Sequence, residues 1–204
     1  MPSGEASMAK IFISYKRGTE LDEPLARDIC QRLTEERDDV FLDQESLGVG
    51  ERWAQAIQQH LESCDLLIVL LSEAAVLSEM VAQEVLFSLR AQTSRGLDDG
   101  ILPVRVTYDG DLPYQFSTLL SGIRDVLWRS AADTEPLFKR LRAAIARVVT
   151  GDGKHTWQKR TPIETGQLTP TLHGRLWRRI RLHHSNYPVV RCQIPRAMSN
   201  ELPT

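Results

Sequence analysis

One acidic residue and a short polar run follow two apolar segments that have the length of β-strands. Glu84 lies early in a predicted helix, twelve positions after Ser72, which ends an aliphatic run. The first apolar run of the chain is followed directly by Tyr15, Lys16 and Arg17. Ligands bind at the carboxyl ends of adjacent strands in open α/β sheets. A carboxylate there can stabilise positive charge, and two cations suit a pyrophosphate, so the spacing predicts a ligand site.

Five short apolar runs must position these residues. They span residues 10–14, 40–42, 65–71, 101–106 and 125–128. Between them apolar residues recur at helical spacing, in the stripes Leu21/Leu25/Ile29/Leu33, Trp53/Ile57/Leu61, Val81/Val85/Leu89 and Leu137/Leu141/Ile145/Val148. Strands that alternate with helices predict right-handed crossovers and a parallel sheet with helices on both faces. The fold class is therefore α/β, with three layers.

The charge of the chain is divided unequally. The formal net charge is −2, yet residues 151–204 carry nine Lys or Arg against three acidic residues, which leaves residues 1–150 at −8. Half of the ten prolines also fall in this last stretch. We expect a disordered N-terminus at 1–9, one domain at 10–150 and a basic, Pro-rich extension or linker at 151–204. The favoured interpretation is that the extension docks on the acidic domain or joins a partner or second module; nucleic-acid and membrane binding are the weaker alternatives.

Several kinds of site are not indicated by the sequence. No GxGxxG, GxxxxGK[ST] or GxSxG motif is present. A phosphoacceptor receiver domain needs an aspartate after the third strand, where Leu70, Leu71 and Ser72 stand. The three cysteines form no CxxC pair, so we predict no metal and no cofactor. The first nine residues lack the apolar core of a signal peptide, and no run is long enough to cross a membrane, which predicts a cytoplasmic protein.

The motifs in their order resemble those of a TIR (Toll/interleukin-1 receptor-like) domain over roughly residues 9–149. Residues 11–17 are similar to the first-strand signature of the family, and residues 41–50 to its second strand and the following BB loop. Residues 64–72 and 102–104 are similar to its third and fourth strands. The resemblance implies a flavodoxin-like five-stranded parallel sheet in the order 2-1-3-4-5. Enzymes of the family carry a glutamate on the helix after the third strand, and Glu84 falls on it, with Met80 and Val81 where Trp and Cys usually stand.

The resemblance implies an NAD⁺ glycohydrolase of the bacterial defence type. Such an enzyme releases nicotinamide and leaves ADP-ribose or a cyclic form of it, in immune or cell-death signalling, and self-association activates it. NAD⁺ is its substrate rather than a cofactor. Cleavage develops oxocarbenium-like charge on the ribose, which Glu84 would stabilise, while nicotinamide leaves as a neutral molecule. The alternative function is a non-enzymatic scaffold that signals through TIR–TIR association.

The same resemblance, together with the position of each residue, indicates a set of substrate-binding candidates. They are Tyr15, Lys16, Arg17, Asp43, Leu47, Trp53 and Met80. Several have a structural alternative: the tyrosine and the tryptophan could pack in the core, the two cations could cap the strand end, and the aspartate could be a turn residue. Gly48 and Gly50 predict a mobile loop suited to gating or self-association.

Overall fold

The computed structural model describes residues 8–42, 51–97 and 100–151 of the 204-residue chain, without the side chains of residues 51–56. The predictions for residues 1–7, for the BB-like loop and for residues 152–204 therefore lie outside the described residues. The proposed boundaries of the three segments stay predictions.

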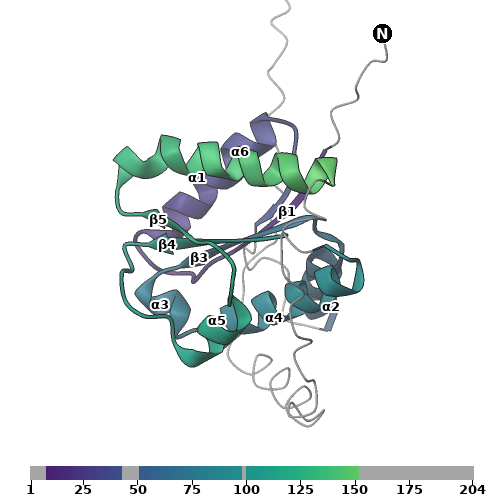
Figure 1. Ribbon diagram of the computed structural model, residues 1–204, viewed down its shortest axis with the longest axis horizontal. Coiled ribbons are helices and arrows are strands. Elements are labelled where there is room, and N and C mark those ends of the chain that lie inside the picture. Colours follow the sequence, from purple (N-terminus) through teal and green to yellow (C-terminus); the bar gives the residue numbers. More distant parts are fainter. Residues whose placement is uncertain (1–7, 43–50, 98–99, 152–204) are drawn as a thin grey trace, which may run out of the picture.

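A five-stranded parallel sheet forms the centre of the domain (Figure 1). Its strands are β1 (Lys10–Ser14), β2 (Asp39–Leu42), β3 (Leu66–Leu71), β4 (Ile101–Val106) and β5 (Val126–Trp128). They lie in the order β2-β1-β3-β4-β5, and every neighbouring pair is parallel. The predicted fold class and strand order are confirmed, and β1 and β3 are adjacent as the predicted site requires.

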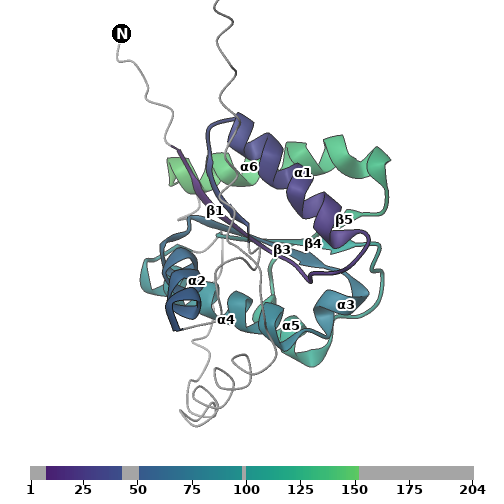
Figure 2. The same cartoon turned by 180° about the vertical axis from the view of Figure 1, so that it is seen from behind.

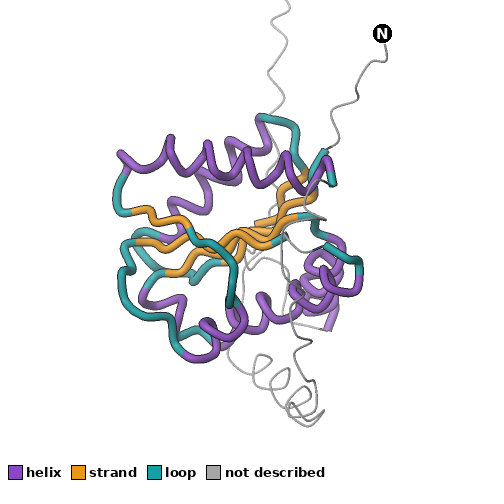
Figure 3. The backbone as a smooth tube through the Cα atoms, in the orientation of Figure 1, coloured by secondary structure: helices purple, strands orange, loops and turns teal. Residues whose placement is uncertain are grey.

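Helices cover both faces of the sheet (Figures 1 and 2). One face carries α1 (Asp22–Glu35) and α6 (Thr134–Thr150). The other carries α2 (Glu51–Ser63), α3 (Glu73–Val76), α4 (Glu79–Ser94) and α5 (Tyr114–Leu119), and the tube in Figure 3 shows the resulting three layers. A 3₁₀ turn, η1 (Ala131–Asp133), leads into α6. Within the described residues, no helix combines the length and the hydropathy needed to cross a membrane.

Alternating side chains of the strands divide the core into two parts. Along β1, Ile11 and Ile13 pack with α1 and α6, whereas Phe12 packs with α2 and α4. Every residue of β3 is buried, as expected for a central strand that is covered on both faces. Because successive side chains of a strand point to opposite faces, each strand contributes to both cores. The same alternation decides which face the polar residues at the strand ends occupy.

Two details differ from the sequence prediction. Leu21 was expected in the apolar stripe of the first helix, but it precedes α1 and is 44% exposed. Asp22 is buried in its place because its carboxylate finds a hydrogen-bond partner inside the domain. The short helices α3 and α5 also have no counterpart in the predicted stripes, since four and six residues are too few to display helical periodicity.

Candidate functional site

Glu84 is held at the carboxyl end of β1 by a serine. Ser14 is the last residue of β1, and its hydroxyl donates to Glu84 Oε2 at 2.5 Å. Ser14 is two positions after Phe12, so its side chain points to the face covered by α4, from which Glu84 projects. Glu84 is only 4% exposed and Ser14 is fully buried. The carboxylate is therefore fixed in a largely dry environment at the predicted edge of the sheet.

A second carboxylate–serine pair lies at the same edge on the other face. Ser72 follows β3 directly, and its hydroxyl donates to Asp22 Oδ2 at 2.5 Å. Asp22 is the first residue of α1 and has no exposed surface. Burial raises the pKa of Asp22 above its ordinary value, and the hydrogen bond from Ser72 offsets part of this rise. Within the described residues, Asp22 Oδ1 has no hydrogen-bond partner.

Both pairs lie where the connections that leave β1 and β3 run in opposite directions across the sheet. From β1 the chain passes through α1 to β2 on one side, and from β3 it passes through α3 and α4 to β4 on the other. In open α/β folds this topological switch point is the usual place of the ligand. The Ser14–Glu84 bond joins β1 to α4, and the Ser72–Asp22 bond joins the end of β3 to α1. Two serine–carboxylate bonds thus connect the segments that diverge there.

Sequence reasoning singled out Glu84 but gave no role to Asp22 or Ser14. A signal for Asp22 exists in the helical spacing, because it precedes the buried Leu25 and Ile29 by three and seven positions. A polar residue on the apolar stripe of a helix must find a partner in the core. The two serines carry no such signal, since a serine after a strand is equally typical of a turn.

The residues that follow β1 are divided between the core and the surface. Tyr15 is 4% exposed and packs in the core beneath α1 and α6, on the face away from Glu84. Lys16 is exposed, and Arg17 is half-buried. The pKa of Glu23 is lowered, mainly by its hydrogen bond with Arg27, with a smaller contribution from the charge of Arg17. The two cations therefore lie at the carboxyl edge, whereas the tyrosine is a core residue.

The remaining candidates are only partly described. Met80 is half-buried in the first turn of α4, one turn before Glu84, so both residues lie on the same side of the helix. Asp43 and Leu47 lie outside the described residues. Trp53 is in α2, but its side chain is not described. Among the described residues, no group of three or more His, Cys, Asp or Glu side chains is arranged to hold a metal ion.

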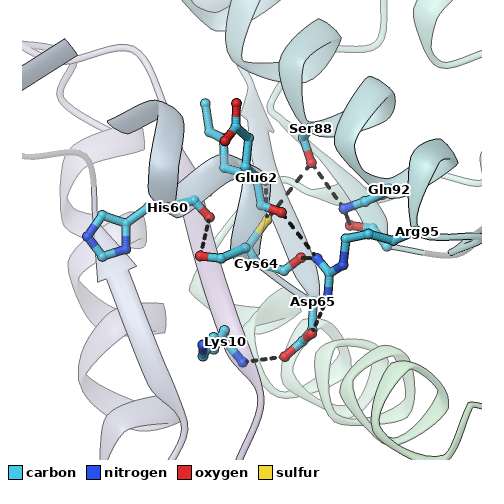
Figure 4. Close-up of polar contacts among 11 residues, drawn as sticks. Lys10, His60, Glu62, Cys64, Asp65, Ser88, Gln92 and Arg95 are labelled. Carbon is cyan, nitrogen blue, oxygen red and sulfur yellow. Dashed lines mark hydrogen bonds and ion pairs between the residues drawn. The ribbon is translucent and has the colours of Figure 1, made fainter. Parts of the chain in front are cut away.

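The opposite, amino-terminal edge of the sheet is occupied by a network of structural hydrogen bonds (Figure 4). Arg95 at the end of α4 donates to the carbonyl of Cys64 at 2.7 Å and pairs with Asp65 at 3.0 Å. Asp65 in turn accepts from the backbone N–H of Lys10 at 2.9 Å. Burial raises the pKa of the Cys64 thiol to about 11, so it is not a reactive thiolate at neutral pH. These groups are used in closing the ends of strands rather than in chemistry.

A small cavity also opens at this amino-terminal edge. It has a volume of about 210 Å³ and is lined by Lys10, Asp39, Phe41, His60, Ser63 and Cys64, among others. The rings of Phe41 and His60 stack at its side, with centroids 3.9 Å apart. Small-molecule sites usually measure about 300–1,000 Å³, so the cavity is small for a dinucleotide. The carboxyl edge with Glu84 remains the candidate site.

Comparison with known proteins identifies the family. The sequence profile described as TIR domain matches residues 11–142, which is more than half of the chain. No curated protein matches the sequence. Solved structures are similar at low identity, and three of them serve as examples. A prokaryotic SEFIR domain has a TM-score of 0.45 and 16% identity, with 76% of this chain and 98% of that chain covered.

The second is the TIR domain of the Toll-related receptor TRR-2 from Hydra magnipapillata, with a TM-score of 0.49 and 17% identity over 67% of this chain and 98% of that chain. The third structure contains the TIR domains of the activated Roq1 resistosome, which directly recognises the pathogen effector XopQ. Its TM-score is 0.42 and its identity 15%, with 84% of this chain and 96% of that chain covered. The profile match includes all five strands except Lys10, the first residue of β1, and bears out the resemblance seen in the motifs. The chain belongs to the TIR domain family.

Proposed function

We propose that this TIR domain is an NAD⁺ glycohydrolase in which Glu84 stabilises the transition state of nicotinamide–ribose cleavage. The observation that carries the proposal is the buried carboxylate of Glu84 at the switch point of the sheet, held by Ser14 at 2.5 Å. A carboxylate in this position is at the usual ligand edge of the fold. The products are nicotinamide and ADP-ribose or its cyclic form.

The chemistry needs one well-placed negative charge. Breaking the N-glycosidic bond leaves positive charge on the ribose, as in glycoside hydrolysis. Nicotinamide is cationic in NAD⁺ and departs as a neutral molecule, so no general acid is required. A carboxylate that is shielded from water and already oriented interacts with the developing cation more strongly than a solvated one. The burial of Glu84 and its bond with Ser14 support this role.

The other predicted residues would bind the rest of the dinucleotide. Lys16 and Arg17 follow β1 and would pair with the pyrophosphate. Met80, one turn before Glu84, would cover the ribose with its apolar side chain. Further contacts are proposed from Asp43, Leu47 and Trp53. Tyr15 would act indirectly, by packing beneath this edge.

The low exposure of Glu84 also bears on regulation. A ribose can approach a side chain that is 4% exposed only after the surrounding chain has moved. We propose that self-association through TIR–TIR contacts produces this movement, so that the isolated domain is weakly active. The same model fits a cytoplasmic role in immune or cell-death signalling of the antiviral defence type, with residues 151–204 linking the domain to a partner or second module.

A second candidate function is a non-enzymatic scaffold, and the same burial favours it. A glutamate that is bonded to a serine in the interior could serve only to fasten α4 to β1. Buried polar pairs are often retained for structural specificity rather than for catalysis. In that case the domain would associate and signal without turnover.

Nicotinamide release from NAD⁺ by the purified full chain tests the proposal. The protein is assayed at low and high concentration, and self-association is followed in parallel by sedimentation. Glu84→Gln keeps the volume of the side chain and an acceptor for Ser14, while it removes the charge. Glu79→Gln is the matched control, since Glu79 is an exposed carboxylate on the same helix.

We expect the rate of nicotinamide release per protein molecule to increase with protein concentration, for wild type and for Glu79→Gln alike. Glu84→Gln should lose at least about 100-fold in turnover with unchanged self-association, which is the usual effect of removing one transition-state charge. Wild-type protein that assembles but releases no nicotinamide would contradict the enzyme and favour the scaffold.

A further inference from the structure

Asp22 occupies a position that the fold alone would give to an apolar residue. It starts the buried stripe of α1 that continues with Leu25 and Ile29, and its side chain has no exposed surface. Burying a carboxyl group costs free energy, and a well-packed apolar residue would avoid this cost. One oxygen of Asp22 accepts from Ser72, whereas the other has no hydrogen-bond partner within the described part of the chain. A carboxylate in the first turn suits the N-terminus of α1, but this does not account for its complete burial and its bond to Ser72.

The Ser72 hydroxyl makes two hydrogen bonds. Its hydroxyl donates to Asp22 Oδ2 at 2.5 Å and accepts from the backbone N–H of Ala75 at 3.2 Å. The second bond caps the N-terminus of α3. The rotation of the Ser72 side chain, and with it the start of α3, is thus fixed by a residue from another element on the opposite face of the sheet.

From α3 the hydrogen bonds continue without a break into α4. The N–H of Val76 donates to the carbonyl of Ser72 at 3.0 Å, and the N–H of Ser78 donates to that of Ala75 at 2.9 Å. The N–H of Ala82 then donates to the carbonyl of Ser78 at 3.1 Å, within the first turns of α4. Glu84 follows two residues later. A shift of Ser72 would therefore pass along this path to the helix that carries Glu84.

We propose that Asp22 is a positioning residue for Glu84, acting through Ser72 and the α3–α4 path. The expected effect of Asp22 on turnover rests on the proposed function. Its expected effect on the hydrogen-exchange protection of α3 and α4 does not. Glu84 acts on the substrate, whereas Asp22 holds the segment that orients Glu84.

Hydrogen exchange of single amides tests the path without any assay of activity. The informative amides are those of Ser78 and Ala82, because neither is bonded to Ser72. Asp22→Ala and Ser72→Ala both remove the Asp22–Ser72 bond, but Ser72→Ala also removes the cap of α3, so Asp22→Ala is the specific variant. Asp22→Asn keeps an acceptor for Ser72. Asp28→Ala is the control, since Asp28 lies on α1 with its side chain 40% exposed and pairs there with Arg32.

We expect both alanine variants to speed exchange at Ser78 and Ala82 by about tenfold or more, as the loss of a buried hydrogen bond implies. Asp22→Asn should stay within about threefold of wild type, and so should Asp28→Ala. The double variant should exchange no faster than Ser72→Ala alone, because the Ser72–Asp22 bond is already absent from that variant. A folded Ser72→Ala protein with unchanged exchange at Ser78 and Ala82 overturns the proposal, even if Asp22→Ala fails to fold.

The kinetic readout then distinguishes positioning from simple stability. We expect Asp22→Ala to lower kcat with KM nearly unchanged, because a displaced Glu84 weakens transition-state stabilisation rather than substrate binding. Asp22→Asn should restore kcat. A raised KM at unchanged kcat would overturn the positioning role. If exchange responds as expected but the wild type releases no nicotinamide, the proposed function fails while the structural path stands.

Discussion

Ser14 and Glu84 are 70 positions apart in the chain, and the hydroxyl of the first donates to Oε2 of the second at 2.5 Å. The bond ties the end of β1 to the second turn of α4, and both partners are buried. It therefore has two consequences: it orients the proposed catalytic carboxylate, and it fastens a helix to the centre of the sheet. The two can be measured separately.

Replacing Ser14 with Ala removes the hydroxyl donor and leaves Glu84 with one bond fewer in the interior. We expect the free energy of unfolding to fall by about 1–3 kcal/mol. Urea denaturation of the purified chain measures this value. Ser94→Ala is the control, because the Ser94 hydroxyl is exposed and donates to a carbonyl of its own helix. Equal losses from the two variants would argue against a special role for the buried pair.

Replacing Met80 with Trp introduces the aromatic residue that enzymes of the TIR family usually carry at this place. Met80 is half-buried one turn before Glu84, so an indole there could lie against the bound nucleotide. We expect KM for NAD⁺ to fall about 2- to 10-fold, the range of one added aromatic contact. Leu77→Trp, on the exposed turn before α4, should leave KM as it is. A similar fall in both variants would indicate nonspecific attraction by surface tryptophan.

Asp22 should make stability depend on pH in a direction opposite to that of a salt-bridged aspartate. Its pKa in the folded state is raised, above all by burial, so folding favours the protonated form. Its contribution to stability is fully present below the unfolded-state pKa, near 3.8, and is lost as pH rises through the raised folded-state pKa. Asp22→Asn cannot titrate. Its stability relative to wild type should therefore increase as pH rises through this window and level off above it.

Urea denaturation of both proteins across that pH range gives the difference directly. Asp38, whose pKa is also raised by burial, contributes equally to both curves and cancels. A difference that is constant with pH would show that Asp22 titrates normally in the folded protein.

Replacing Gly100 with Ala should destabilise the amino-terminal edge of the sheet. A Cβ atom at Gly100 would overlap the side chain of Gln92, which donates to the Gly100 carbonyl at 2.6 Å and to Ser88 at 3.0 Å. We expect a loss of about 1–3 kcal/mol in the free energy of unfolding, the usual cost of overpacking. Gln92→Ala made in addition should recover part of it, since the overlap is relieved. If the double variant recovers no stability, the loss arises from the backbone at Gly100 and not from the overlap with Gln92.

Much of the fold could be predicted from the sequence because local patterns of apolar residues indicate its longer strands and helices. The aliphatic run at 65–71 predicted a central strand, and β3 is buried along its whole length. The stripe of Val81, Val85 and Leu89 predicted the buried face of α4, and all three are buried. Periodicity says less about short elements, so α3 and α5 were not anticipated. At the N-terminus of α1, periodicity favoured Leu21 for the core although Asp22 takes that place.

The sequence by itself determined the order of strands and helices along the chain, the edge of the sheet at which polar residues gather, and Glu84 as a carboxylate at that edge. These follow from hydrophobic spacing and from the motifs of the family, both of which are properties of neighbouring residues. Only the tertiary structure decided that Glu84 is buried against Ser14, that Tyr15 faces the other core, and that Asp22 reaches Ser72. Burial and hydrogen-bond partners depend on contacts between residues 50 to 70 positions apart, and no local pattern encodes such contacts.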